Sequence, residues 1–152
     1  MKRVSIPWLA AGVAIICVIW GNSLMPGASS NGFSLHVLDD VRSLLDSLGI
    51  ASGWLTNFVV RKAAHFSEYA VLGAVMAKAI DPMRTFDRAR LFALCLTLVL
   101  VPSIDETIQL FVPGRSGMVT DVLLDCSGAA FGVLLSASIG RALRHRRNYL
   151  QK

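Results

Sequence analysis

Four long apolar segments, separated by short polar stretches, dominate the chain. They cover residues 7–24, 63–80, 91–111 and 119–141. Each has close to the roughly 20 apolar residues with which a helix crosses the hydrocarbon core of a bilayer. None alternates apolar and polar positions as a barrel strand does, and a lipid-exposed segment must form its backbone hydrogen bonds within itself. The pattern predicts an all-α membrane protein, a four-transmembrane-helix bundle built as one integral membrane domain over residues 1–152.

Residues 25–60 interrupt this pattern and predict an exterior loop between the first two spans. Gly, Ser and Asn are frequent at positions 26–32, which indicates an irregular connection. Leucine and valine then recur at helical spacing across positions 35–48, opposite acidic residues, and predict a short exterior amphipathic helix on the membrane surface. Ser52 is the expected N-cap of the next helix, which we expect to begin near Trp54 and to continue into the second span.

Small residues and one proline distinguish the last two spans. Gly128, Gly132, Ser136 and Gly140 recur every four residues, so they share one helix face and permit close helix approach. Pro102 lies inside the third span, where we expect it to kink the helix.

The composition agrees with a membrane protein, since 54% of the 152 residues are hydrophobic, only 16% are charged and the mean hydropathy is +0.57. Eleven of the fifteen basic residues flank the same ends of the predicted helices, at Lys2, Arg3, Lys78, Arg84, Arg88, Arg90, Arg141, Arg144, Arg146, Arg147 and Lys152. Because cytoplasmic loops retain Lys and Arg, both termini are predicted to be cytoplasmic. The net charge of +5 then reflects topology and contact with anionic lipids, and no nucleic-acid partner is expected.

The N-terminal segment has a second interpretation. Two basic residues precede an apolar run that ends in small residues near position 28, as in a secretory signal peptide. The run is long for such a peptide, and Trp8 and Trp20 are placed as interface anchors. Cleavage would leave three spans and the same exterior face.

Polar side chains gather at the exterior ends of the last three predicted spans, at spacings that place them on shared helix faces. They are Arg61, His65 and Glu68, then Asp105, Glu106 and Gln109, then Asp121 and Asp125, with Arg115 in the turn between the last two spans. Ionisable residues in membrane helices are costly and therefore mark candidate functional sites. Because a short connection makes the last two spans antiparallel neighbours, we expect their acids to face one another.

Several functions fit this polar cluster. In the favoured, non-enzymatic hypothesis, Arg61 and Arg115 bind an anionic lipid headgroup or a lipid-linked precursor, while Asp105 and Asp121 hold Arg115 in place. A network that only fixes helix register and proton-coupled transport by an oligomer are alternatives. Membrane lipids are the expected partners, and the formation of homo-oligomers is left open.

A divalent-metal enzyme acting on a lipid-linked substrate is a further alternative. Its ligands would come from His65, Glu68, Asp105, Asp121 and Asp125. The sequence holds no recognisable catalytic motif, so enzymatic activity stays open and no cofactor is predicted.

The order and spacing of these residues resemble the VanZ-like family. The resemblance rests on residues 61–69 (RKAAHFSEY), 105–115 (DETIQLFVPGR) and 121–132 (DVLLDCSGAAFG), and covers nearly all of residues 54–140. It implies a small multi-pass protein of the bacterial cytoplasmic (inner) membrane that acts in the cell envelope. The founding member is associated with low-level teicoplanin resistance, so the resemblance suggests a link to glycopeptide antibiotic resistance. Family members often carry Asn where this chain has Asp125.

Overall fold

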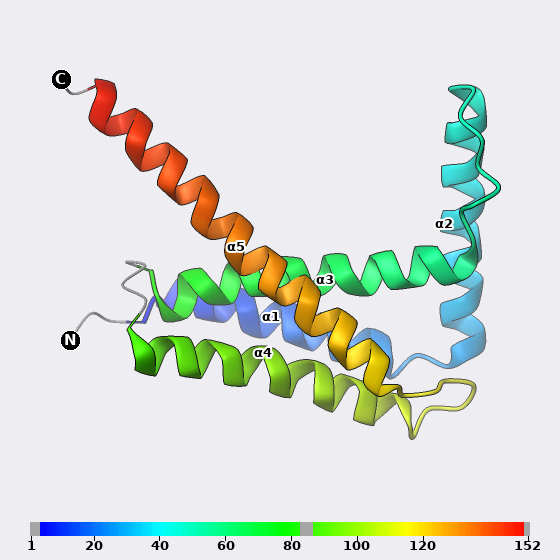
Figure 1. Ribbon diagram of the computed structural model, residues 1–152. Coiled ribbons are helices and arrows are strands. Elements are labelled where there is room, and N and C mark those ends of the chain that lie inside the picture. The colour runs from blue at the N-terminus through cyan, green and yellow to red at the C-terminus, as the bar shows by residue number, and fades with distance from the viewer. Residues whose placement is uncertain (1–3, 83–86, 151–152) are drawn as a thin grey trace.

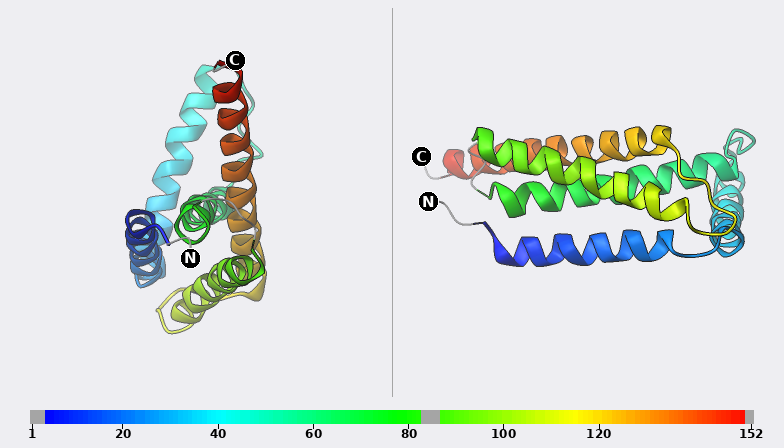
Figure 2. Two further views of the ribbon diagram at one scale, coloured as in Figure 1. Left: turned by 90° about the vertical axis from the view of Figure 1, so that its left-hand side faces the viewer. Right: turned by 90° about the horizontal axis from the view of Figure 1, so that it is seen from below.

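The computed structural model describes residues 4–82 and 87–150, and within these ranges all regular structure is helical. Its helices are α1 (Ile6–Ser23), α2 (Gly27–Ser47), α3 (Asn57–Ile80), α4 (Arg88–Gln109) and α5 (Val119–Leu150). Helices α1, α3, α4 and α5 form an elongated bundle, and α2 lies crosswise at one end of it (Figure 1, Figure 2). Because α1 and α4 run opposite to α3 and α5, both ends of the described chain lie away from α2.

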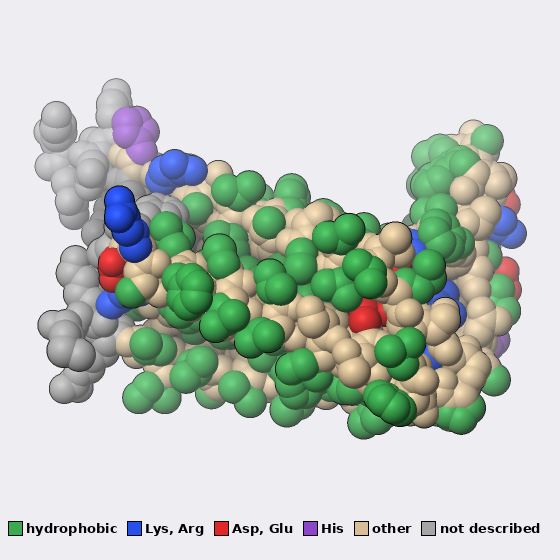
Figure 3. All heavy atoms as spheres, turned by 60° about the horizontal axis from the view of Figure 1, so that its bottom comes forward, with side chains coloured by type: hydrophobic (Ala, Val, Ile, Leu, Met, Phe, Trp, Pro, Cys, Tyr) green, Lys and Arg blue, Asp and Glu red, His purple; other side chains and the backbone are tan. Residues whose placement is uncertain are grey.

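Three helical segments are long and apolar enough to cross a membrane: Ile6–Ser23, Arg88–Gln109 and Val119–Leu143. Hydrophobic side chains cover much of the bundle between its ends (Figure 3), as contact with lipid tails requires. Helix α3 has 24 residues and is therefore about 36 Å long, at 1.5 Å per residue, but it lacks a stretch as apolar as those three. The structure thus supports a multi-pass membrane protein, and the fourth span remains a prediction.

Helix α3 is the central element of the bundle, since it contacts all four other helices. Its Tyr69 and Leu72 are fully buried, Met76 is nearly so, and they belong to one core with Ile19 of α1 and Leu98 of α4. In its first half, Lys62 and His65 pair with acidic residues of α5. These ion pairs satisfy part of the charge that α3 carries.

Helices α3 and α5 touch through their backbones. A β-carbon on Gly132 would lie 1.8 Å from the carbonyl oxygen of Ala70, and one on Gly73 would lie 2.1 Å from that of Ala129. Gly128 is equally restricted, because a β-carbon there would lie 2.4 Å from a carbonyl oxygen of α3. The small-residue stripe predicted on the last span is therefore a contact face, and it fixes the rotation of α5 against α3.

Pro102 lies inside α4, and the helix continues through it to Gln109. A proline has no N–H to donate, so the carbonyl of Leu98, four residues earlier, is left without its helical partner. That carbonyl accepts a weak bond from the Cys126 thiol of α5, with the sulfur 3.6 Å away. The neighbouring Val101 carbonyl accepts a bond from the Trp20 indole of α1 at 3.3 Å. The proline thus frees one backbone acceptor, the Leu98 carbonyl, and α5 uses it.

Helix α2 begins at Gly27, so the prediction of a loop over positions 26–32 is wrong. The Gly27 N–H donates to the carbonyl of Pro113 at 3.0 Å, and a β-carbon on Gly27 would lie 1.9 Å from the carbonyl oxygen of Gly114. This contact with a distant turn fixes the first turn of α2. The loop preference of Gly, Ser and Asn could not reveal it, because such local preferences yield to tertiary contacts.

The amphipathic character predicted for positions 35–48 is present in α2. Hydrophobic side chains gather on the side of α2 that faces the far end of the bundle, and charged ones on the opposite side (Figure 3). Phe33, Leu44 and Leu48 are exposed large apolar residues of this region. A crosswise helix with this pattern has the form of one that lies in a membrane surface.

The start of α3 corrects another expectation. The helix begins at Asn57, and its N-cap is Thr56, whose hydroxyl accepts a hydrogen bond from the Val59 N–H at 3.3 Å. The predicted cap, Ser52, lies in the preceding loop and donates to the Asp46 carboxylate at 2.8 Å.

Of the basic residues assigned to one membrane side, those that the structure describes lie at the end of the bundle away from α2, where α3 ends and α4 begins, or in the C-terminal part of α5. Lys2, Arg3, Arg84 and Lys152 fall outside the described residues, as do the side chains of Arg144, Arg146 and Arg147.

Candidate functional site

A cavity of about 390 Å³ opens between α1, α2 and α3, beside the turn that precedes α5. Its apolar walls come from Ile19, Met25, Phe33, Val37, Val60 and Ala64, and its polar lining from Asn22, Ser23, Ser30, Ser34, Arg61, His65, Glu68 and Arg115. Sites for small molecules and cofactors combine apolar walls with a few polar groups in this way, at volumes of about 300–1,000 Å³.

The spacing of Arg61, His65 and Glu68 predicted a shared face of α3, and all three line this cavity. The prediction of a common face is therefore confirmed. Arg61 makes no hydrogen bond or ion pair with any residue in the described parts of the chain, and it lies only partly buried on the cavity wall. Its guanidinium is available to a ligand.

Arg115 is anchored at the end of α1. Its Nε donates to the carbonyl of Met25 at 2.9 Å, one terminal nitrogen donates to the carbonyl of Asn22 at 2.7 Å, and the other reaches Gln109 Oε1 at 3.5 Å. The carbonyls at the C-terminal end of a helix lack helical partners and attract cations. This attraction, rather than the expected hold by Asp105 and Asp121, positions Arg115.

Arg61 and Arg115 face the same cavity and repel each other. Burial, together with the charge of Arg61, lowers the pKa of Arg115 from its ordinary value. Arginine stays charged at physiological pH despite such a shift, so the cavity holds two cations close together.

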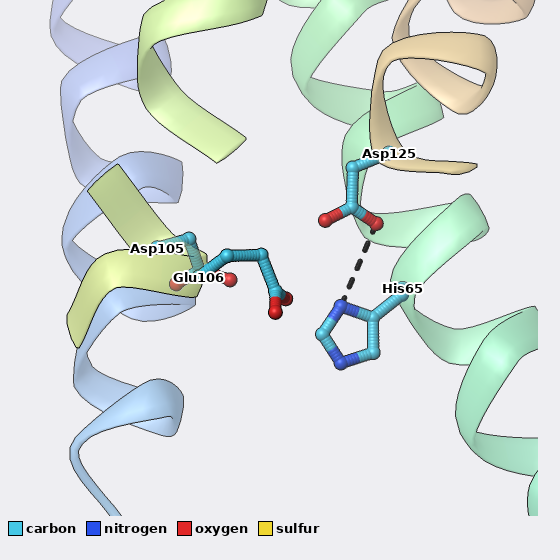
Figure 4. A group of neighbouring side chains, drawn as sticks. All are labelled: His65, Asp105, Glu106 and Asp125. Atoms are coloured by element: carbon cyan, nitrogen blue, oxygen red, sulfur yellow. Dashed lines mark ion pairs between the residues drawn. The ribbon is translucent and has the colours of Figure 1, made fainter. Parts of the chain in front are cut away.

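Next to this cavity, three helices bring four ionisable side chains together (Figure 4). They are His65 of α3, Asp105 and Glu106 of α4, and Asp125 of α5, and each offers a ligand atom within 4.8 Å of those of the others. His65 Nδ1 lies 3.5 Å from Asp125 Oδ1. The expectation that acids of the last two spans face one another is met by Asp105, Glu106 and Asp125, whereas Glu68 and Asp121 lie outside the group.

The outer edge of this group is held by hydrogen-bond donors. Gln109 Nε2 donates to Glu106 Oε1 at 3.0 Å and lies 3.4 Å from Asp105 Oδ2, while the Met118 N–H donates to Glu106 Oε2 at 2.8 Å. Gln109 also reaches Ser23 of α1 at 3.4 Å. Gln109 thus links the acids of α4 to α1, and through its own oxygen to Arg115.

Asp121 pairs with Lys62 of α3, and the Lys62 ammonium also lies 5.2 Å from the ring centre of Phe58. Lys62 was not among the predicted site residues, although it follows Arg61 directly. The four-residue spacing predicted that Asp121 and Asp125 share a face of α5. They lie one turn apart and have different partners on α3: Asp121 pairs with Lys62, and Asp125 pairs with His65. Only the crossing of α3 and α5 could assign these pairs.

The sequence profile of the VanZ/LLP1 family matches residues 8–140, which is most of the chain. The chain belongs to the VanZ/LLP1 family. No curated protein and no solved structure gives a significant match. Every residue described above around the cavity and the acidic group of this VanZ/LLP1 protein lies inside the matched range.

Proposed function

We propose that this VanZ/LLP1 protein binds the anionic headgroup of an envelope lipid, or of a lipid-linked precursor, in the cavity between α1, α2 and α3. The observation that carries the proposal is the pair of guanidinium groups on one partly apolar cavity. Arg61 has no partner among the described residues, and Arg115 holds only a long contact of 3.5 Å on its Gln109 side. Arg61 therefore keeps the pair of donors through which arginine binds a phosphate, and Arg115 adds a second positive charge to the same cavity.

The remaining lining suits an amphiphile. Phe33, Val37 and Val60 offer apolar contact for the first part of a lipid tail, and the exposed apolar side of α2 continues this surface. Glu68 can accept a hydrogen bond from a hydroxyl or ammonium group of the headgroup. A phosphate placed between Arg61 and Arg115 would also relieve the repulsion between them.

The proposal includes a topology. We place α3 across the bacterial cytoplasmic membrane as the fourth span, because it lies among α1, α4 and α5 and is long enough to cross. The excess of Lys and Arg at the opposite end favours cytoplasmic termini, and so puts the cavity and α2 at the exterior surface.

Native mass spectrometry of the detergent-purified protein tests the binding. We expect the wild type to retain one molecule of added phosphatidylglycerol and to retain phosphatidylcholine at least tenfold less well. Undecaprenyl phosphate forms a separate arm, because stronger retention of this probe would identify a lipid-linked precursor as the source of the phosphate.

The test variant combines Arg61→Gln and Arg115→Gln in one protein. The matched control is the single variant Arg88→Gln. Arg88 is an exposed cation at the opposite end of the bundle, so its loss changes the net charge without touching the cavity. Retention of both anionic lipids by the double variant at the wild-type level would overturn the proposal, as would an equal loss in Arg88→Gln.

A further inference from the structure

The acidic group beside the cavity contains more carboxyl groups than there are basic side chains paired with them. Asp105, Glu106 and Asp125 are buried, with exposed fractions of 0%, 4% and 0%. Lys62 is committed to Asp121, and Arg115 to backbone carbonyls and Gln109. Within the described residues, His65 is the only basic side chain within ion-pair distance of any of the three. Buried carboxylates without compensating charge are expensive.

Several atoms at the centre of this group have no donor. Both carboxylate oxygens of Asp125 and Oδ1 of Asp105 are buried and have no hydrogen-bond partner within 3.5 Å at good geometry among the described residues, although Asp125 Oδ1 lies 3.5 Å from His65 Nδ1. Native structures seldom leave such atoms unsatisfied, and a bound ion is one way in which proteins satisfy them. Asp105 and Glu106 receive N–H donors from Gln109 and Met118 at the outer edge, and the hydroxyls of Ser23 and Tyr69 lie beside Asp105. Whichever oxygen Asp125 contributes to the group, it is therefore an atom without a hydrogen-bond donor.

We propose that His65, Asp105, Glu106 and Asp125 form a divalent-cation site. Ligand atoms at about 2.0–2.4 Å from a metal lie at most about 4.8 Å apart when they are opposite each other. The four side chains meet this limit, since one ligand atom from each lies within 4.8 Å of the others. Gln109 and Met118 then act as the outer partners that orient ligands in metal sites.

The donor set indicates the kind of cation. Three carboxylates and one imidazole, with no thiolate, suit a first-row divalent ion such as Mn²⁺ or Zn²⁺ rather than a soft metal. His65 also lines the lipid cavity, so a cation bound here would lie next to the proposed headgroup site. The metal site itself does not rest on the proposed lipid binding, because it can be measured without lipid.

Mn²⁺ titration of the metal-stripped, detergent-purified protein tests the site, with free Mn²⁺ followed by electron paramagnetic resonance. We expect one bound Mn²⁺ per chain, a loss of affinity of at least 100-fold in Asp125→Asn, and a 10- to 100-fold loss in Gln109→Ala. Zn²⁺ should compete for the same site. Glu68→Gln is the matched control, because Glu68 is a neighbouring carboxylate that lies outside the group, and it should bind Mn²⁺ within about threefold of the wild type.

Folding is checked in the same samples. A wild-type melting temperature that rises with added Mn²⁺ supports the site even where Asp125→Asn does not fold, since a ligand that binds only the native state stabilises it. Wild-type protein that takes up no Mn²⁺ or Zn²⁺ at millimolar concentration would overturn the proposal. So would a loss in Glu68→Gln as large as that in Asp125→Asn.

Discussion

The contact between α3 and α5 makes a sharp prediction for Gly132→Ala. The added β-carbon would lie 1.8 Å from the carbonyl oxygen of Ala70, whereas real β-carbons essentially never come within 3.0 Å of another heavy atom. The two backbones would therefore have to separate by at least about 1.2 Å at this point. Neither partner is a flexible side chain that could turn away, so the strain must be spread over both helices.

The expected cost is about 3 kcal/mol, the upper end of the usual range for overpacking, because backbone meets backbone. Separation would also loosen the neighbouring contact between Gly73 and Ala129, where the corresponding distance is 2.1 Å. The measurement is the free energy of unfolding from a titration with sodium dodecyl sulfate in mixed micelles, followed by circular dichroism.

Gly21→Ala is the matched control, because Gly21 lies inside α1 and a β-carbon there has no heavy atom within 4 Å. Alanine at such a position should stabilise the helix by about 0.5–1 kcal/mol. Equal unfolding free energies for the two variants would refute the inference that α3 and α5 are in backbone contact.

Three other predictions use the same protein. Thr56→Ala should lower the unfolding free energy by about 1 kcal/mol by removing the cap of α3, and Thr56→Ser should retain most of it. A double-mutant cycle with Lys62→Gln and Asp121→Asn should give a coupling energy of about 1 kcal/mol, and a value of zero would contradict the ion pair. The topology can be tested in a variant without the native cysteines. Ser116→Cys should react with a membrane-impermeant maleimide in intact cells, whereas Arg88→Cys should react only after permeabilisation. The reverse pattern would show that the proposed topology is inverted.

Much of the fold follows from local pattern. Helical spacing placed Arg61, His65 and Glu68 on one face, and all three line one cavity. The stripe of small residues on the last span likewise predicted a close helix contact. Both results depend only on the geometry of a single helix, which a sequence specifies directly.

The failures lie where two distant segments meet. The start of α2 depends on Gly27 meeting the turn at Pro113, and no local signal encodes that contact. The partners of Arg115 are backbone carbonyls, which every residue possesses, so a search for oppositely charged side chains could not find them. Likewise, the assignment of Lys62 to Asp121 required the crossing of α3 and α5.

The anchoring of Arg115 on carbonyls has a consequence for both proposals. Had Arg115 paired with Asp105, as charge alone predicts, one cation would have been withdrawn from the cavity and one carboxylate of the acidic group neutralised. Arg115 instead bonds to carbonyls at the C-terminal end of α1, which carry partial negative charge. The cavity therefore keeps two guanidinium groups, and none of the three carboxyls of the acidic group is used to hold Arg115. The backbone of α1 thus separates positive from negative charge, and His65, which pairs with Asp125 and also lines the cavity, is the side chain at which the two regions meet.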